Sequence, residues 1–181
     1  MNIFNKIKMK RILFSFIALS FMLAASSQKG PSVVSTVDLK RYMGKWYEIA
    51  RLPNFFEKKL KCISATYTLR DDGKITVLNE GNLITDPAKT SSSEGVAWAP
   101  DKKSPAKLKV QFFWPFSGDY WIMYLDDEYR YVLVGDPDNK YLWILCRERT
   151  MDENTYSMLL QKAIDNGYDV KPIIRVEHNC N

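Results

Sequence analysis

Short stretches in which hydrophobic and polar residues alternate recur along the chain from residue 36 onwards. Successive side chains of a strand point to opposite faces, so a period of two indicates strands buried on one side. Residues that favour turns separate these stretches at the spacing typical of hairpins. The pattern predicts eight strands, at residues 45–51, 62–69, 74–80, 93–99, 107–114, 120–125, 130–135 and 141–147.

The segments between the predicted strands are short and rich in turn-forming residues. The clearest are "DDGK" (71–74), "TDPAK" (85–89), "SGD" (117–119) and "DPDNK" (136–140), and "TSSSEG" (90–95) is expected to turn into a strand. Eight strands at hairpin spacing favour an up-and-down antiparallel sheet, and closure removes its exposed edges. The predicted fold is therefore all-β, an eight-stranded antiparallel barrel.

One segment near the C-terminus has a helical period instead. Thr150 and Glu153 have the spacing of a capping box, and Asn166 and Gly167 form a stop signal. Between them one apolar face contains Tyr156, Leu159, Leu160, Ala163 and Ile164. We expect a single C-terminal helix packed outside the barrel, followed by an extended segment, "VKPIIRVEH", along the barrel wall.

The N-terminal segment has the organisation of a secretory signal peptide. Four basic residues and no acid precede an uncharged apolar run at residues 12–25, and small residues follow. The run is too short to cross a bilayer as a helix, and a buried core helix is the alternative. We expect a signal peptide at residues 1–26, one domain at 27–181, and export to the periplasm or the medium.

Removal of that segment changes the charge balance. The full chain has 26 basic and 21 acidic residues, and four of the basic ones precede residue 12, which leaves 22 against 21. A nearly neutral chain gives no electrostatic basis for binding nucleic acid. The composition of the full chain, which is 46% hydrophobic, fits one globular domain. A monomer is the default expectation and a dimer the alternative.

The strand pattern also predicts which side chains converge inside the barrel. If Trp46 faces inward, every second residue of each strand does so too. The resulting set mixes rigid aromatics with Ala and Gly and includes the polar Asn79, whereas branched aliphatics would fill a solid core. Since an eight-stranded barrel is the size that holds one small ligand, the set favours a cavity. Tight packing of these residues on each other is the alternative.

Catalytic chemistry has little support in the sequence. The single histidine, His178, lies in the tail, where we expect it to be solvated, and one imidazole builds neither a triad nor a multi-histidine metal set. Cys62 and Cys146 both face outward by strand parity. Glu48 is an acid assigned to the interior, where we expect a hydrogen-bonded structural carboxylate. No catalytic residue, metal site or cofactor is predicted.

Three stretches of the chain carry the signature of a known family. They read "DLKRYMGKWYEIAR" (38–51), "FFEKKLKCISATYTLRDDGKITVLNEG" (55–81) and "YLWILCRER" (141–149). Asp127 and Tyr131 fit a fourth, looser motif with one extra residue between them. Together these stretches resemble the lipocalins, and more narrowly the branch of the bacterial outer-membrane lipocalin and apolipoprotein D. No cysteine lies near the expected cleavage site to accept a lipid anchor, so outer-membrane association is the weaker alternative to a soluble exported form.

The resemblance implies a closed base and an open mouth. At the base, Arg147 stacks on Trp46, and Gly44 lets the chain approach closely as it enters the first strand. The first loop, "RLPNFFEKK", folds over the open end, with Phe55 and Phe56 at the mouth. The branch also ties a second-strand cysteine to the C-terminal segment, which implies a Cys62–Cys180 disulfide and leaves Cys146 as a small buried hydrophobe.

The function implied is the binding, storage or transport of a small hydrophobic ligand, such as a fatty acid or lysophospholipid, without catalysis. The tyrosine hydroxyls and Asn79 are the expected partners of its head group. The expected lining residues are Ala50, Phe55, Phe56, Ala65, Tyr67, Val77, Asn79, Ala97, Val110, Phe112, Tyr120, Ile122, Tyr124 and Trp143.

Two alternatives to a dedicated carrier remain. The stretch "FFWPFSGDYW" (112–121) places six aromatics near the expected mouth, which suits peripheral contact with a membrane or another protein. Packing of most of these aromatics into the pocket wall is the competing interpretation. Some lipocalins are isomerases that use an inward cysteine, and a cofactor-free lipid isomerase is the less favoured second alternative.

Overall fold

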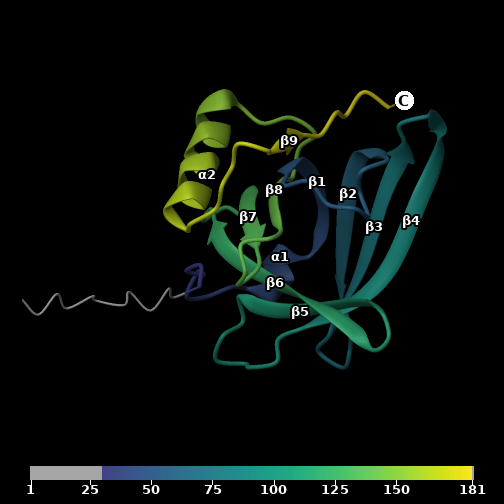
Figure 1. Cartoon of the computed structure of the whole chain (residues 1–181). Coiled ribbons are helices and arrows are strands. Elements are labelled where there is room, and N and C mark those ends of the chain that lie inside the picture. The colour runs from purple at the N-terminus through teal and green to yellow at the C-terminus, as the bar shows by residue number, and fades with distance from the viewer. Residues whose placement is uncertain (1–29, 181) are drawn as a thin grey trace, which may run out of the picture.

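The computed structural model describes residues 30–180, which wind through eight strands that close into a barrel (Figure 1). Each strand pairs antiparallel with the next, and β1 pairs with both β2 and β8. The strands are β1 (Gly44–Arg51), β2 (Leu60–Leu69), β3 (Ile75–Leu83), β4 (Asp86–Trp98), β5 (Lys107–Phe113), β6 (Phe116–Leu125), β7 (Tyr131–Gly135) and β8 (Leu142–Cys146). This confirms the predicted all-β barrel. The expected signal peptide lies outside the described residues and stays a prediction.

Two turns were predicted in the wrong place. Residues 86–95 belong to β4, and the chain turns at Ile84 and Thr85 instead. Residues 117–119 belong to β6, and the turn of that hairpin is Trp114–Pro115. In both cases ladder pairing with the neighbouring strand satisfies the backbone groups, so small polar residues can extend a strand whose side chains face solvent.

Within residues 30–180, two helices accompany the barrel. The short α1 (Leu39–Tyr42) is capped by the Asp38 carboxylate, which accepts from the amides of Lys40 and Arg41. The longer α2 (Glu153–Asp165) begins after Asp152, whose carboxylate accepts from the amide of Thr155. The predicted cap at Thr150 is therefore wrong by two residues, because Asp152 supplies the oxygen that the first turn needs.

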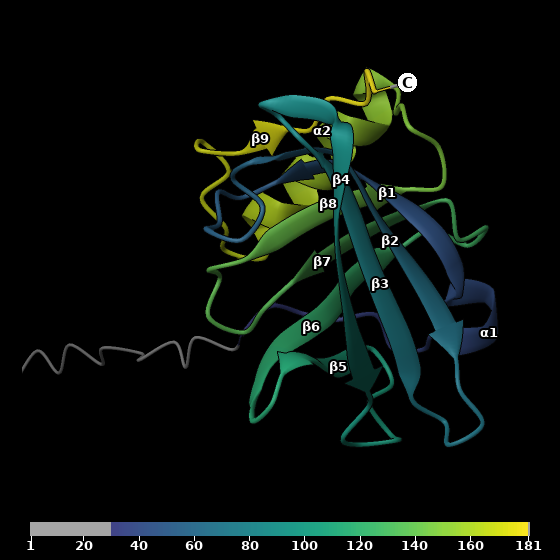
Figure 2. The same ribbon diagram turned by 90° about the vertical axis from the view of Figure 1, so that its right-hand side faces the viewer.

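The apolar face of α2 packs on the outside of the barrel, as predicted, except that Ile164, which was assigned to this face, is exposed. Tyr156, Leu159 and Ala163 are buried in an outer cluster that includes Leu133 from β7 and Ile144 from β8. Figures 1 and 2 show α2 on the side of the barrel away from β3 and β4. After α2 the chain forms β9 (Ile174–Arg175), which pairs with β1 and gives the extended C-terminal segment expected.

The base of the barrel is built around a stacked cation. The Arg147 guanidinium lies 3.8 Å from the centre of the Trp46 ring, and the Trp46 indole donates to the carbonyl of Tyr42 at 2.9 Å. The same guanidinium donates to the carbonyls of Lys45, Arg41, Tyr42 and Tyr129. Arg147, which follows β8, therefore ties α1, β1 and the loop between β6 and β7 together at one end of the barrel.

Gly44 permits this close approach. Its φ of +94° lies in the region that favours glycine, and an added Cβ would lie 3.3 Å from Nη1 of Arg147. A side chain at this position would strain the backbone and crowd the cation.

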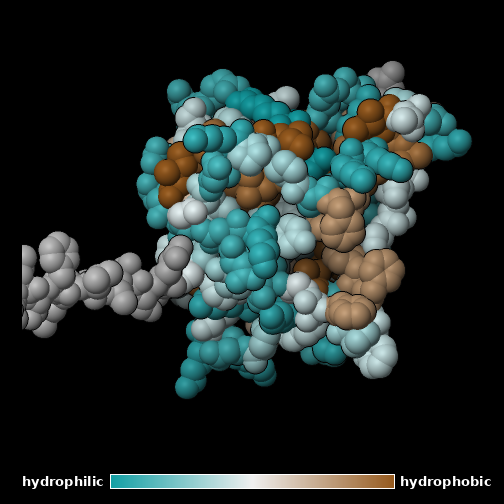
Figure 3. Space-filling model, viewed as in Figure 1, coloured by the Kyte–Doolittle hydropathy of each residue, from teal (hydrophilic) through white to brown (hydrophobic). Residues whose placement is uncertain are grey.

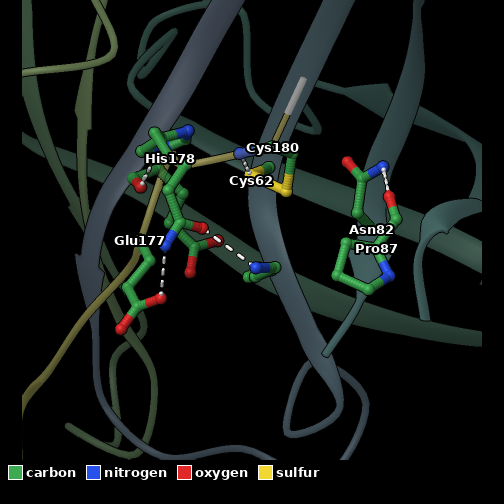
Figure 4. Close-up of a disulfide and its surroundings, with 9 residues drawn as sticks. Cys62, Asn82, Pro87, Glu177, His178 and Cys180 are labelled. Atoms are coloured by element: carbon green, nitrogen blue, oxygen red, sulfur yellow. Dashed lines mark hydrogen bonds between the residues drawn. A yellow bond between two sulfur atoms is a disulfide. The ribbon is translucent and has the colours of Figure 1, made fainter. Parts of the chain in front are cut away.

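The C-terminal tail is fastened to the outside of β1 and β2 (Figure 4). A disulfide joins Cys62 to Cys180, and the Cys62 amide donates to the carbonyl of Glu177 at 2.8 Å. His178 is half-buried, with Nε2 2.8 Å from the carbonyl of Glu48 and its ring edge-on to Tyr47. The expectation of a solvated His178 is therefore wrong, because the disulfide holds the tail against the barrel; burial lowers the pKa of the imidazole.

Replacing Arg147 by Ala should destabilise the barrel. The variant loses the stack on Trp46 and four hydrogen bonds to main-chain carbonyls, so we expect a fall of about 3 kcal/mol in the free energy of unfolding. Urea denaturation followed by tryptophan fluorescence measures it. Arg70→Ala, which removes an exposed ion pair with Asp72, is the matched control and should change little. Equal effects of the two variants would refute this role.

Removing the disulfide should also lower stability. The bond closes a loop with a sequence separation of 118, which corresponds to roughly 4 to 5 kcal/mol in the chain-entropy model, an upper expectation. We expect the Cys62→Ser/Cys180→Ser variant to unfold at lower denaturant than the wild type. Reductant should bring the wild type to the variant's midpoint and leave the variant unchanged. A wild type insensitive to reductant would contradict the prediction.

Candidate functional site

The barrel encloses a cavity of about 750 Å³ that opens at the end opposite the Arg147 base. Its mouth lies between the β1–β2 loop, the β5–β6 hairpin and the segment that joins β7 to β8. Figure 3 shows tan and brown hydrophobic side chains around a hollow on the right-hand half of the surface. The volume lies within the range of pockets for small molecules.

Most of the residues that parity assigns to the site do line this cavity. They come from six of the strands and from the first loop, and they combine aromatic, aliphatic and small side chains. The predicted residues found in the lining are Phe55, Phe56, Ala65, Tyr67, Val77, Asn79, Ala97, Val110, Phe112, Tyr120 and Trp143.

Ala50 and Tyr124 face away from the cavity, so their predicted inward orientation is wrong. A register shift in β1 falls between Glu48 and Ala50, and one in β6 falls between Ile122 and Tyr124. Each shift reverses the alternation of side chains beyond it. Ala50 consequently joins the outer cluster beneath α2, and the ring of Tyr124 lies 4.4 Å from Nζ of Lys162.

Ile122 faces the interior but does not line the cavity. It is fully buried in the interior cluster with Trp46, Val132 and Val134, where it packs as core. The expectation that it contacts a ligand is therefore not supported by its position. The alternation of side chains along a strand predicts whether a residue faces the interior, but not how far along the barrel axis it lies.

Several lining residues were not predicted as part of the site. Ile63, Leu108 and Leu145 had been assigned inward by parity, so the pattern did contain their signal. Glu57 lies in the first loop, where no strand period exists to assign a face, and sequence reasoning had no means of finding it. Ser91 and Ser92 were missed because they were expected to lie in a turn, and Ser93, the first residue of the predicted strand 93–99, was not named as a lining residue.

Three tyrosines form a hydrogen-bonded group inside the barrel. The Tyr120 hydroxyl lies 2.7 Å from that of Tyr42 and 2.9 Å from that of Tyr67. Burial raises the pKa of all three phenols, so they stay neutral. Because these hydroxyls already pair with one another, they are poorer head-group partners than predicted. Asn79 has no side-chain hydrogen bond to any residue in the described part of the chain, and it remains available.

A buried group of charges lies beside the cavity, where one structural carboxylate was expected. Glu48 is 3% exposed, Arg51 3% and Glu57 7%. Nη1 of Arg51 donates to Oε1 of Glu48 at 2.8 Å, and Nη2 donates to the main-chain oxygen of Glu57 at 3.0 Å. Burial, and then the nearby charge of Glu57, raise the pKa of Glu48 well above its usual range, although Arg51 opposes them.

Aromatic rings surround Glu57 at the mouth. The Trp143 indole donates to Oε2 of Glu57 at 3.2 Å and stacks on Tyr141 with ring centres 5.8 Å apart. Phe56 lies against both rings, with its centre 5.9 Å from Tyr141 and 6.5 Å from Trp143. These three rings, called the mouth aromatics below, all line the cavity.

A closed eight-stranded barrel with an external helix and an apolar cavity matches one protein family. The family model described as "Lipocalin-like domain" matches residues 37–178. The chain belongs to the lipocalin family. It is 43% identical over 162 residues to the outer membrane lipoprotein Blc of Escherichia coli K12, covering 87% of this chain and 91% of that protein. It is 37% identical over 159 residues to apolipoprotein D of Macaca fascicularis, covering 83% and 82%.

The fold comparison agrees with the sequence comparison. Insecticyanin from the tobacco hornworm Manduca sexta superposes with a TM-score of 0.63 at 25% identity, covering 82% of this chain and 84% of that structure. The cavity is therefore the calyx of a lipocalin, a family that binds small hydrophobic ligands. Within residues 30–180, no three or more His, Cys, Asp or Glu side chains gather in a way that would hold a metal ion.

The tip of the β5–β6 hairpin exposes three large aromatic side chains. Phe113 is 74% exposed, Trp114 86% and Phe116 78%. Phe113 and Phe116 also border the calyx, and Phe112 and Tyr120, from the same stretch, line it with less exposed side chains. The aromatic stretch is thus divided between the pocket wall and the surface. Over the described part of the chain, no helix has the length and apolar character needed to cross a membrane.

Proposed function

We propose that this lipocalin binds, stores or transports a single-chain lipid, such as a fatty acid or lysophospholipid, in its calyx. The observation that carries the proposal is the apolar cavity of about 750 Å³ with one open end. Each buried CH₂ of an acyl chain contributes about 0.8 kcal/mol before the costs of ordering and association. Aliphatic lining residues such as Val77, Leu108 and Val110 offer no geometry that selects one apolar chain over another.

The proposed role is binding without catalysis. Cys62 is in a disulfide, and Cys146 is buried in the outer cluster, where burial raises the pKa of its thiol. Neither sulfur reaches the calyx as a thiolate, which disfavours the isomerase alternative. His178 lies on the outside of the barrel against the backbone of β1.

We further propose that the protein acts after export, in the periplasm or the medium. The cationic and apolar start of the chain and the Cys62–Cys180 disulfide support an oxidising compartment. The similarity to an outer membrane lipoprotein is consistent with export.

A second role, peripheral contact with a lipid surface, is supported by the exposed hairpin tip. Phe113, Trp114 and Phe116 lie next to the mouth, where they would place the calyx opening against a bilayer from which a lipid could enter.

Filling the calyx should weaken lipid uptake without unfolding the protein. Ala65→Phe places a ring in the cavity, and we expect its affinity for a fluorescent fatty acid to fall at least about tenfold as buried apolar contact is lost. Thr68→Phe, on the exposed face of the same strand, is the matched control and should bind like the wild type. Absence of saturable uptake by the wild type, with no copurifying lipid by mass spectrometry, would refute the carrier function.

Removing the exposed aromatics should weaken membrane contact. The wild type should float with liposomes of zwitterionic lipid in a density gradient, and Phe113→Ser/Trp114→Ser/Phe116→Ser should stay at the bottom. Ile174→Ser, an exposed hydrophobic on β9, is the control and should float. Failure of the wild type to float, or equal flotation of the triple variant, would remove this second role.

A further inference from the structure

The buried charges beside the calyx do not balance. Glu48 and Glu57 line the cavity, and both contact the single guanidinium of Arg51. Taking charge out of water is costly unless each ion is paired. Two carboxylates with one guanidinium therefore need a further positive charge, which either a proton on Glu48 or a bound cation can supply.

Arg51 engages Glu48 more closely than it engages the carboxylate of Glu57. Its Nε lies 3.7 Å from Oε2 of Glu57 and has no hydrogen-bond partner within the described chain. The Glu57 carboxylate instead accepts from the neutral donors Trp143 and Asn54. Neutral donors orient a carboxylate without cancelling its charge, so Glu57 is the carboxylate best placed to meet a cation in the calyx.

The mouth aromatics stand beside that carboxylate. Trp143 both donates to Glu57 and presents its ring to the cavity, with Tyr141 stacked on it and Phe56 across from them. Aromatic faces attract cations through the ring quadrupole, and rings next to a carboxylate are the arrangement that recognises ammonium groups.

The remaining charges of the calyx act in the same direction. Six of its described lining residues are acidic, and Lys140 is the single basic one among them. Nζ of Lys140 is already 3.1 Å from Oδ2 of Asp138. A ligand carboxylate would therefore meet no unpaired cation among these lining residues and would approach surplus negative charge.

We propose that Glu48, Glu57 and the mouth aromatics form a head-group subsite for ammonium-bearing single-chain amphiphiles, so that the calyx prefers cationic heads to free carboxylates. This inference rests on the proposed carrier function and specifies its ligand class. The ammonium can belong to an alkylamine or to the head of a lysophospholipid, and the chemistry at the subsite is the same.

The first experiment varies only the head group and uses the wild-type protein. Dodecyltrimethylammonium, dodecanoate and monododecanoylglycerol, each below its critical micelle concentration, compete with the neutral probe N-phenyl-1-naphthylamine. We expect the ammonium compound to bind at least about tenfold more tightly than dodecanoate, with the glycerol ester between them. Equal or tighter binding of dodecanoate would overturn the subsite while leaving the carrier function intact. Failure of the neutral probe to bind would refute the carrier function itself.

Variants then locate the effect. Glu57→Gln and Glu48→Gln should each weaken dodecyltrimethylammonium about tenfold and leave dodecanoate unchanged or tighter. Glu80→Gln is the control, since Glu80 also lines the calyx but forms an ion pair with the exposed Lys45. Equal loss in the control would overturn the assignment to Glu48 and Glu57.

A last comparison distinguishes the two sources of the ammonium group. If lysophosphatidylcholine binds more tightly than dodecyltrimethylammonium and loses affinity in the Glu57→Gln variant, the result supports the subsite and favours a phospholipid as its ligand. If dodecylamine binds as tightly as lysophosphatidylcholine and also loses affinity in the Glu57→Gln variant, the result supports the subsite and favours a simple amine as its ligand. Insensitivity of both to Glu57→Gln would overturn the proposal.

Discussion

The double pairing of β1, with β2 on one side and β8 on the other, is the constraint on which the remaining structure depends. It closes the sheet, so alternate side chains of eight strands converge on one interior. Closure also needs a base that holds the first and last strands together, and Arg147 provides it by stacking on Trp46 while donating to four carbonyls from three segments. Because Arg147 closes one end of the barrel, the cavity lies toward the other end and opens there.

The two register shifts give this barrel two hydrophobic layers. The first half of β1 builds the interior, and after the shift Ala50 and its neighbours serve the outer cluster under α2. The same holds for β6, where Ile122 packs inside and Tyr124, two residues on and beyond the shift, packs against the outer cluster. Glu48 lies at the first of these shifts, with its side chain on the calyx and its carbonyl bound by His178 of the tail. The backbone at Glu48 therefore contacts the calyx on one side of the barrel wall and the C-terminal tail on the other.

The fold was predictable from sequence because it follows from a repeated local rule. Alternation found all eight strands, a 3.6-residue period found α2, and the family signature gave the Cys62–Cys180 bond. The site was predictable as far as that rule holds. Ala50 and Tyr124 were misplaced because a bulge leaves no mark in the pattern of hydrophobic residues. Glu57 could not be found, since a loop has no period, and its approach to Glu48 depends on tertiary folding of the first loop.

The outer layer is not distributed evenly around the barrel. α2 and the tail cover β1, β7 and β8, whereas the outward side chains of β4 meet water along most of its length. Local stability follows the density of buried contacts, so we expect the wall around β4 to open locally at a lower free energy than the wall under α2. We therefore expect β3, β4 and β5 to move outward when a ligand is too large for the empty calyx. The half of the barrel that α2 and the tail cover would keep its shape, so the carboxylates of Glu48 and Glu57 would keep their positions relative to the ligand.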